Sequence, residues 1–307
     1  MLPLHTPMRG LRCFCVAAEC LSFKETAKKL YLTPSAVSHQ IKQLEENLNL
    51  ALFERKTRAV VLTEAGKRFY QAIAPQMEQL AADVLQRFGA PHLVFNNAGV
   101  GAGGLVWENS VKDWEWVLGV NLWGVVHGVR LFTPMMLAAA KADPAWRGHI
   151  INTASMAGLL AAPNMGIYNV SKHAVVSLSE TLYQDLSLVT DQIGASVLCP
   201  FFVPTGINQS HRNRPGDLPA EKPTKSQLIG QAMSDKAVGS GKVTAAEVAQ
   251  KVFDAAAQGQ FYIYSHPKAL ASVQTRMEDV MMGRNPTDPF AAKPELGAQL
   301  RAALRAD

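Results

Sequence analysis

Several features that would place a chain in a membrane or in a secreted framework are missing from this sequence. It contains no run of about 18 consecutive apolar residues, so no membrane-spanning helix is predicted. Its first ten residues lack the basic segment and apolar stretch that open a secretory signal. We therefore expect a cytoplasmic protein with no membrane association.

Cysteine is also scarce, which limits disulfide and metal chemistry. The 307 residues contain four cysteines, namely Cys13, Cys15, Cys20 and Cys199. The first three lie close together, but no second cluster of Cys or His at zinc spacing accompanies them. We expect buried, reduced thiols and no metal site.

Positive charge is distributed unevenly along the chain. The net charge is +5, from 30 Lys+Arg and 25 Asp+Glu. Residues 1–80 hold 11 Lys+Arg and 7 Asp+Glu, a balance of +4, which leaves 19 and 18, or +1, for the rest. This asymmetry favours a front segment that meets a polyanion, although a solvated basic surface would give the same count.

Two short helices are predicted near the front of the chain. Ser22, with a glutamate three residues later, forms a capping box that starts a helix over 22–30. Thr33 followed by Pro34 starts a second helix that runs to about residue 47. Two short helices joined by a tight turn form a helix-turn-helix. The spacing alone leaves open a DNA-reading helix or a plain helical hairpin with a polar outer face.

The second helix has an inward apolar stripe and an outward polar face. Val37, Ile41, Leu44 and Leu48 recur at helical spacing and would face inward. A basic hairpin downstream would extend toward DNA phosphates. The predicted DNA contacts are therefore Thr33, Ser35, Ser38, His39, Lys42, Arg55 and Arg58.

This front segment resembles a known regulator family. FKETAKKLYLTPSAVSHQIKQLEENLNLALFERKTRAVVLTEAGKRFY, residues 23–70, resembles LysR-type transcriptional regulators, most clearly in TPSAVSHQI, LFER and LTEAG. The resemblance covers roughly residues 8–85. It implies a winged helix-turn-helix at 1–62 that binds duplex DNA and a linker helix at 63–88. His39 departs from the family's usual arginine and carries less charge at neutral pH.

The rest of the sequence alternates between strand and helix patterns. Strand patterns occupy 92–96, 148–158, 194–206 and 261–265, and helix patterns occupy 109–142, 168–186 and 244–258. Strands that alternate with helices of this length indicate a parallel sheet covered by helices. The predicted fold class is therefore α/β.

Polar residues near the expected strand ends carry a chemical pattern. Tyr168 and Lys172 are four residues apart on one helix, so both face the same way. A lysine ammonium near a phenol favours the phenolate and lowers the pKa of the tyrosine. Ser155 follows a strand and is placed to bond a substrate oxygen. With Asn121, these residues form the predicted catalytic set.

Together with NNAG at Asn96–Gly99, this set resembles the short-chain dehydrogenase/reductase family over about residues 82–285. The resemblance implies that Tyr168 is the general acid/base, that Lys172 lowers its pKa and binds the nicotinamide ribose, that Ser155 orients the carbonyl and that Asn121 holds a proton-relay water. It implies NAD or NADP as cofactor and a small alcohol or ketone as substrate. The implied cofactor contacts are Asn97, Ala98, Gly99, Tyr168, Lys172 and Thr205.

The glycines of this chain do not form the family's phosphate loop. Gly99, Gly101 and Gly104 fit G-x-G-x-x-G, but no helix is expected to open directly on them. The family's T-G-x-x-x-G-x-G loop does not occur in the sequence. The resemblance therefore implies, for residues 89–307, a truncated doubly wound sheet with the family's strands 4–7, and weak cofactor binding. Phe201 also replaces a glycine that is usual in the family.

Three hypotheses remain open at this stage. The chain is a DNA-binding regulator whose second part serves assembly, an NAD(P)-dependent oxidoreductase with a vestigial front, or a non-functional chimera. The dehydrogenase resemblance also implies that helices at about 110–140 and 166–188 pack between subunits of a homodimer or tetramer. The apolar residues expected there are Trp114, Val117, Val125, Val129, Leu178 and Leu182.

Overall fold

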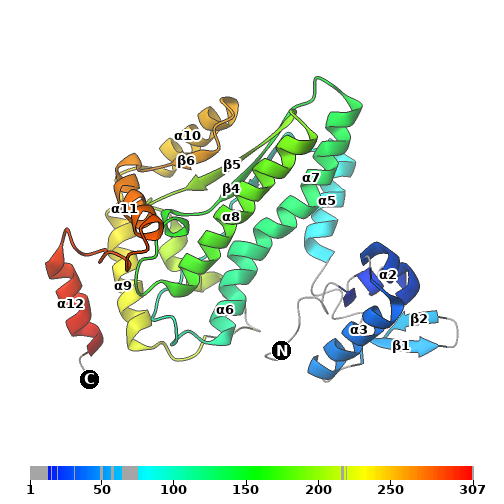
Figure 1. The fold of residues 1–307 in the computed structure, drawn as a ribbon, viewed down its shortest axis with the longest axis horizontal. Helices are drawn as coiled ribbons and strands as arrows, with labels where there is room; N and C mark the ends of the chain where they lie inside the picture. The colour runs from blue at the N-terminus through cyan, green and yellow to red at the C-terminus, as the bar shows by residue number, and fades with distance from the viewer. Residues whose placement is uncertain are drawn as a thin grey trace. The chain divides into compact units, whose positions relative to one another are not determined.

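The structure is a computed structural model that describes residues 13–14, 16–18, 20–30, 32–48, 51–56, 59–63, 75–215, 218 and 220–305. The chain divides into two compact units, residues 1–86 and 87–307 (Figure 1). Helix α5 (Pro75–Phe88) carries the chain from one unit to the other. Residues 64–74 of the predicted linker helix lie outside the described residues.

The N-terminal unit contains the two expected helices, α2 (Phe23–Leu30) and α3 (Pro34–Leu48). Both begin as the sequence predicts. The Ser22 Oγ accepts a hydrogen bond from the backbone N–H of Glu25 at 3.4 Å, and the Thr33 Oγ1 accepts one from Ala36 at 3.2 Å. The predicted inward residues Val37, Ile41 and Leu44 are fully buried, whereas the side chain of Leu48 lies outside the described residues.

A short hairpin follows these helices. Strands β1 (Phe53–Lys56) and β2 (Ala59–Leu62) pair in antiparallel fashion, with Phe53 opposite Leu62. The Glu45 carboxylate of α3 accepts hydrogen bonds from the backbone N–H groups of Leu52 and Phe53, at 2.8 and 2.9 Å. The hairpin is thereby fixed to α3, and the buried Phe53 joins the core beneath both helices.

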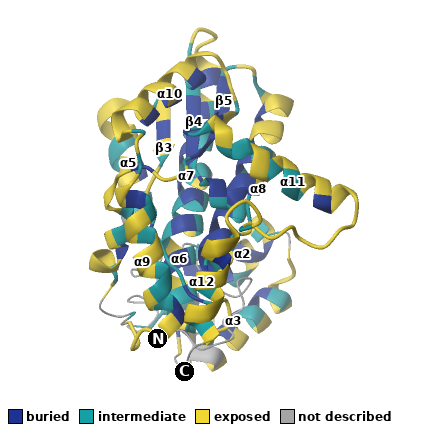
Figure 2. Ribbon diagram, turned by 90° about the vertical axis from the view of Figure 1, so that its left-hand side faces the viewer, coloured by how far each residue is buried: buried dark blue, intermediate teal, exposed yellow. Residues whose placement is uncertain are grey.

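The C-terminal unit is built on a parallel four-stranded sheet in the order β3-β4-β5-β6, counted over the described residues. The strands are β3 (Leu93–Asn96), β4 (Gly148–Thr153), β5 (Ile193–Cys199) and β6 (Tyr262–Tyr264). Figure 2 shows buried residues along β4 and β5 and exposed residues on the outer side of α10. This architecture confirms the α/β class.

Helices cover both faces of this sheet. On β5, Val197 and Cys199 pack in one cluster with α7 (Gly124–Ala142) and α8 (Gly166–Val189). Leu198 points to the opposite face and packs with α10 (Ala245–Ala257). The alternation follows from the two-residue period of a strand, and burial on both faces accounts for the continuous apolar character of β5.

The long helix predicted at 109–142 is interrupted. It consists of α6 (Val111–Leu118), the π-helical turn η1 (Gly119–Trp123) and α7. Residues 111–142 form the one helix in the described part of the chain that is long and apolar enough to cross a membrane. Counting consecutive apolar residues missed it because polar residues such as Asn121 interrupt the run. Of its most apolar window, 22% is buried inside the structure.

Strand β3 forms one edge of the sheet within the described residues. Val94 is buried against the α7 face, whereas Leu93 and Phe95 are 43% and 45% exposed on the α10 face. The Phe95 ring contacts the Phe253 ring of α10, edge to face, with ring centroids 5.8 Å apart. An exposed apolar edge strand of this kind favours pairing with another strand.

Some predicted boundaries were wrong. The strand predicted at 194–206 ends at Cys199, because Pro200 and Pro204 lack the N–H group that a ladder requires. Three helices were not predicted: α9 (Lys225–Gly239), α11 (Leu270–Met281) and α12 (Pro294–Arg305). Short helical turns η2 (Met156–Gly158), η3 (Gly206–Asn213) and η4 (Pro267–Ala269) connect the larger elements.

Candidate functional site

Three of the predicted residues converge at the carboxyl end of β3. A Cβ atom placed on Gly99 would lie 3.5 Å from the Asn121 Oδ1 and 3.5 Å from the Lys172 Nζ. Gly99 belongs to the loop after β3, Asn121 to η1 and Lys172 to α8. In open α/β sheets, ligands bind outside the carboxyl ends of the strands.

Asn121 is fully buried in the π-helical turn, and its side chain holds the loop in place. Its Oδ1 accepts from the Val100 N–H at 2.8 Å, and its Nδ2 donates to the Val100 carbonyl at 3.0 Å. The same Nδ2 lies 3.0 Å from the Ser171 Oγ on α8. π-helical turns are frequent at functional sites because the extra residue redirects a side chain.

Ser155 lies just beyond β4 and is half-buried. Its Oγ accepts from the Ala157 N–H at 3.1 Å and donates to the Pro200 carbonyl at 3.3 Å. It also hydrogen-bonds the side chain of Tyr168. The structure therefore brings Ser155 and Tyr168 together as the sequence predicts.

The expected effect of Lys172 on Tyr168 is not what the structure shows. Burial is the largest influence on the Tyr168 phenol and raises its pKa above 10.0, because a buried phenolate loses its hydration. The hydrogen bond from Ser155 acts in the opposite direction but is weaker. The Lys172 Nζ lies over the Tyr168 ring, 5.7 Å from its centroid, and donates to the Thr153 carbonyl at 3.0 Å.

Lys172 is itself strongly perturbed. It is 2% exposed, and burial lowers its pKa from 10.5 to about 8, while its interaction with Cys199 acts in the opposite direction. Burial in turn raises the pKa of the Cys199 thiol to about 12, so this cysteine stays protonated at neutral pH. Lys172 is therefore a cation whose charge changes near physiological pH.

This shift predicts a pH-dependent stability. Between about pH 8 and 10.5 the unfolded chain binds more protons at Lys172 than the folded chain, so the free energy of unfolding should rise with pH across that window. Relative to Lys172→Met, the wild type should gain up to about 3 kcal/mol between pH 8 and 10.5. Urea unfolding at several pH values measures the difference, and Lys141→Met, at an exposed lysine, should follow the wild type. Parallel wild-type and Lys172→Met curves would contradict the prediction.

The predicted cofactor contacts are more open. Asn97, Ala98 and Thr205 are exposed. Asn97 accepts a hydrogen bond from the Thr153 hydroxyl at 2.9 Å, and Thr205 caps η3 through the Ile207 N–H at 3.4 Å. The first helix after Gly104 begins at Val111, so the G-x-G-x-x-G glycines do not open directly onto a helix.

A buried polar chain beneath the site was not predicted. The Asn96 Nδ2 donates to the Asn152 Oδ1 at 2.8 Å, and the Asn152 Nδ2 donates to the Ser179 Oγ at 3.0 Å. Gly128 of α7 is required here, because a Cβ atom would collide with the Asn96 side chain. The paired asparagines of NNAG were the available signal, since an amide side chain that is covered by a neighbouring helix needs hydrogen-bond partners.

The predicted DNA contacts lie on one unit but are only partly described. Thr33, Ser35, His39 and Lys42 are exposed, and Ser38 is half-buried. The Lys42 Nζ lies 3.6 Å from the Glu46 carboxylate, one turn along α3. The side chain of Arg55 and the whole of Arg58 lie outside the described residues.

Two families match this chain. The short chain dehydrogenase family matches residues 42–216, and the family of bacterial regulatory helix-turn-helix proteins of the lysR type matches residues 8–67. The two matches overlap over residues 42–67. Both resemblances expected from the sequence are thereby confirmed.

Individual proteins are also similar to this chain. A CLA biosynthesis dehydrogenase/reductase of Lactiplantibacillus plantarum is 30% identical over 209 residues, 67% of this chain and 71% of that protein. An NAD-dependent oxidoreductase of Mycobacterium tuberculosis is 33% identical over 165 residues, 52% of this chain and 58% of that protein. A short chain dehydrogenase/reductase from Burkholderia phymatum, crystallised with NAD, is 54% identical over 70% of this chain and 75% of that chain, with a TM-score of 0.68. The chain thus spans less than two thirds of the mycobacterial relative.

Proposed function

The chain belongs to the short-chain dehydrogenase family, and on that premise we propose that Asn121, Ser155, Tyr168 and Lys172 form the proton-transfer half of a site for a small alcohol or ketone. The observation that carries the proposal is the convergence of Gly99, Asn121 and Lys172 beside the bonded pair of Ser155 and Tyr168. Tyr168 and Lys172 share α8, and the other groups come from separate elements.

Each side chain has a role that follows from its surroundings. A phenol whose pKa is raised by burial stays protonated at neutral pH, so Tyr168 is suited to donate a proton to a carbonyl oxygen. Ser155 donates a hydrogen bond to the same oxygen. Lys172 stabilises negative charge that develops on the phenol. Asn121 acts through Val100, because its side chain fixes the loop that borders the site.

The residues fit one end of a nicotinamide dinucleotide better than the other. Lys172 and Tyr168 fit the nicotinamide ribose, and the dinucleotide would supply or accept the hydride. The pyrophosphate end lacks a partner of the usual kind within the described residues, because no glycine turn leads directly into a helix there. We therefore propose weak binding of NAD or NADP and a dehydrogenase fold that lacks the family's glycine-rich N-terminal half.

Calorimetric titration of the full chain with NAD and NADP tests this assignment. Weak binding that is lost in Lys172→Met but kept in Lys141→Met would support it. Binding that is indifferent to Lys172 would contradict it, because the ribose end is the only end that we assign to this chain.

A second function is supported by the helix-turn-helix match at residues 8–67. We propose that the N-terminal unit is a winged helix-turn-helix that binds duplex DNA through the outward face of α3, with the β1–β2 hairpin against phosphates. The buried stripe of α3 supports this placement, since it turns His39 and Lys42 outward.

We also propose a homodimer or tetramer, with one correction to the expected contacts. Val117, Val125 and Leu182 are buried in the chain's own core and are not available to a partner. A groove of about 470 Å³ remains between α7 and α8, and Val129 and Leu178 line it. Apolar faces of this kind are rarely left uncovered.

This assembly predicts that a charged side chain in the groove will change the oligomeric state. Leu178→Arg should convert the oligomer to a monomer, because an arginine buried against an apolar partner lacks a counter-charge. Light scattering after size exclusion measures the mass. Met281→Arg, at an 85% exposed methionine of α11, is the matched control and should leave the oligomer intact. A well-folded wild-type monomer would contradict the proposal.

A further inference from the structure

A long connection after β5 folds back across the loop that leaves β3. We call residues 206–239, which comprise η3, α9 and the chain between them, the cover segment; residues 216, 217 and 219 lie outside the described part. The Gly101 N–H donates to the Ser210 Oγ at 2.9 Å, and the Leu105 N–H donates to the Ser226 Oγ at 2.9 Å. The cover segment is thus fixed to the loop that follows Gly99 at two places, in η3 and in the first turn of α9.

The contact is closest at two glycines. A Cβ atom on Gly103 would lie 3.1 Å from the Cα of Gly230 in α9, so the two backbones cross almost in contact. The Asn164 Nδ2 also donates to the Ser226 carbonyl at 3.0 Å, just before α8 and Tyr168 begin. The cover segment therefore packs on two stretches of chain that border the candidate site, the loop after Gly99 and the residues just before α8.

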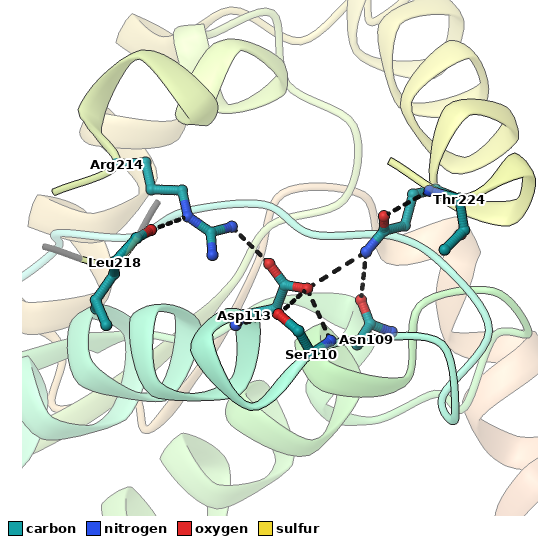
Figure 3. Close-up of polar contacts among 7 residues, drawn as sticks. Asn109, Ser110, Asp113, Arg214, Leu218 and Thr224 are labelled. Carbon is teal, nitrogen blue, oxygen red and sulfur yellow. Dashed lines mark hydrogen bonds and ion pairs between the residues drawn. The ribbon is translucent and has the colours of Figure 1, made fainter. Parts of the chain in front are cut away.

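Arg214 is the centre of the attachment, between η3 and α9. Its side chain is 11% exposed, and its Nη1 donates to the Asp113 Oδ1 at 2.5 Å (Figure 3). Its Nε donates to the Leu218 carbonyl at 2.5 Å, which folds the connection back on itself. Its guanidinium stacks over Trp116 of α6, with the Cζ 5.1 Å from the ring centroid. One side chain thereby joins the cover segment to α6.

Asp113 accepts the remaining hydrogen bonds of this network. Its side chain is 14% exposed. Its Oδ2 accepts from the Ser110 N–H and Oγ–H, both at 2.9 Å, and from the Gln227 Nε2 of α9 at 3.4 Å. Gln227 also accepts from the Thr224 N–H at 3.0 Å and so caps α9 (Figure 3). A single carboxylate links the start of α6, Arg214 and the first turn of α9.

The charges of this pair depend on each other. Burial acts to raise the pKa of Asp113, but the hydrogen bonds from Arg214 and Ser110 outweigh it and hold the pKa below 3.8. Removing either partner of a buried pair leaves an uncompensated buried charge, which is more damaging than the loss of an exposed pair. The Asp113–Arg214 pair should therefore be either intact, with the cover segment attached to α6, or broken, with the cover segment detached.

We infer that Asp113 and Arg214 form a latch that holds the cover segment closed over the candidate site. Access for a substrate requires this pair to separate or the cover segment to move as a unit around it. The latch goes beyond the proposed chemistry, because it acts through chain contacts and needs neither cofactor nor turnover.

The test is local protease sensitivity of the full chain. In the cover segment, Arg214 and Lys222 precede prolines and resist trypsin, which leaves cleavage after Arg212, Lys225 and Lys236. Asp113→Asn should increase cleavage after Arg212 and Lys225 at least about tenfold, since proteolysis follows the open population. Asp191→Asn makes the same charge change at an exposed site and should match the wild type.

A second variant keeps the test decisive if Asp113→Asn fails to fold. Arg214→Lys keeps the charge but loses the planar fork, and it does not alter the trypsin sites because Pro215 follows. It should give an intermediate increase. Hydrogen exchange should accelerate in residues 206–239 and stay unchanged in β4 and β5. Wild-type cleavage in a folded Asp113→Asn or Arg214→Lys chain, or equal acceleration throughout the sheet, would overturn the latch. Neither result bears on the catalytic proposal.

Discussion

The purified full chain is expected to reduce ketones or oxidise alcohols very slowly, even at saturating substrate. Binding energy from remote parts of a cofactor positions the reacting atoms, and a misplacement of about 1 Å costs roughly 10²-fold in rate. The pyrophosphate end of the site has no glycine turn that leads into a helix within the described residues. We therefore expect rates at least about 10²-fold below those of a complete relative.

Nicotinamide absorbance with a panel of alcohols and ketones measures this rate. Tyr168→Phe removes the proton donor and should lower the slow rate further, because misplacement of the cofactor and loss of the general acid both raise the barrier of the same chemical step. Tyr183→Phe, a half-exposed tyrosine on the same helix, is the matched control. A separate βαβαβ fragment of a related enzyme should raise the rate by pairing with β3. Robust turnover by the unaided chain, abolished by Tyr168→Phe but not by Tyr183→Phe, would contradict the prediction of slow turnover. It would show that the chain is a fully active dehydrogenase.

Binding of duplex DNA by the full chain is expected to fall steeply with salt. A protein that contacts about 6–10 phosphates loses roughly 10³–10⁵ in affinity between about 50 and 200 mM salt, because counterions are released on binding. Lys42 of α3 lies on the outward face, although Glu46 is within 3.6 Å and competes for it.

Fluorescence anisotropy at several salt concentrations tests the contacts individually. Lys42→Ala and Arg55→Ala should each lower affinity for all sequences and reduce the salt slope by about one unit. Lys141→Ala, an exposed lysine of the other unit, should change neither quantity. His39→Arg restores the family's usual residue and should raise affinity. Salt-independent binding, or no binding, would remove the DNA proposal.

The local features of this chain were readable from its sequence. Ser22 and Thr33 marked the starts of α2 and α3. Short apolar runs identified the strands of the sheet, and apolar residues at helical spacing identified α3. The four-residue step from Tyr168 to Lys172 placed both on one face of α8. These features depend only on neighbours along the chain.

Features that depend on distant residues were not readable. Asp113 and Arg214 are paired across 101 positions, and nothing near either residue indicates the other. The raised pKa of Tyr168 reflects burial by the whole unit, whereas the sequence showed only the nearby lysine. Helix α9 contains Gly230 and lacks a clear apolar period. The Thr224–Gln227 capping box was its one available signal.

The edge position of β3 has a consequence for synthesis. β3 pairs with β4, and Asn96 lies about fifty residues before the first residue of β4. At roughly 5–20 residues per second, a ribosome needs several seconds to supply that partner strand. During this interval Leu93 and Phe95 are exposed to solvent without any sheet beside them. The yield of folded protein should therefore depend on translation speed and on chaperones that bind short apolar segments, and slower elongation between β3 and β4 should lower it.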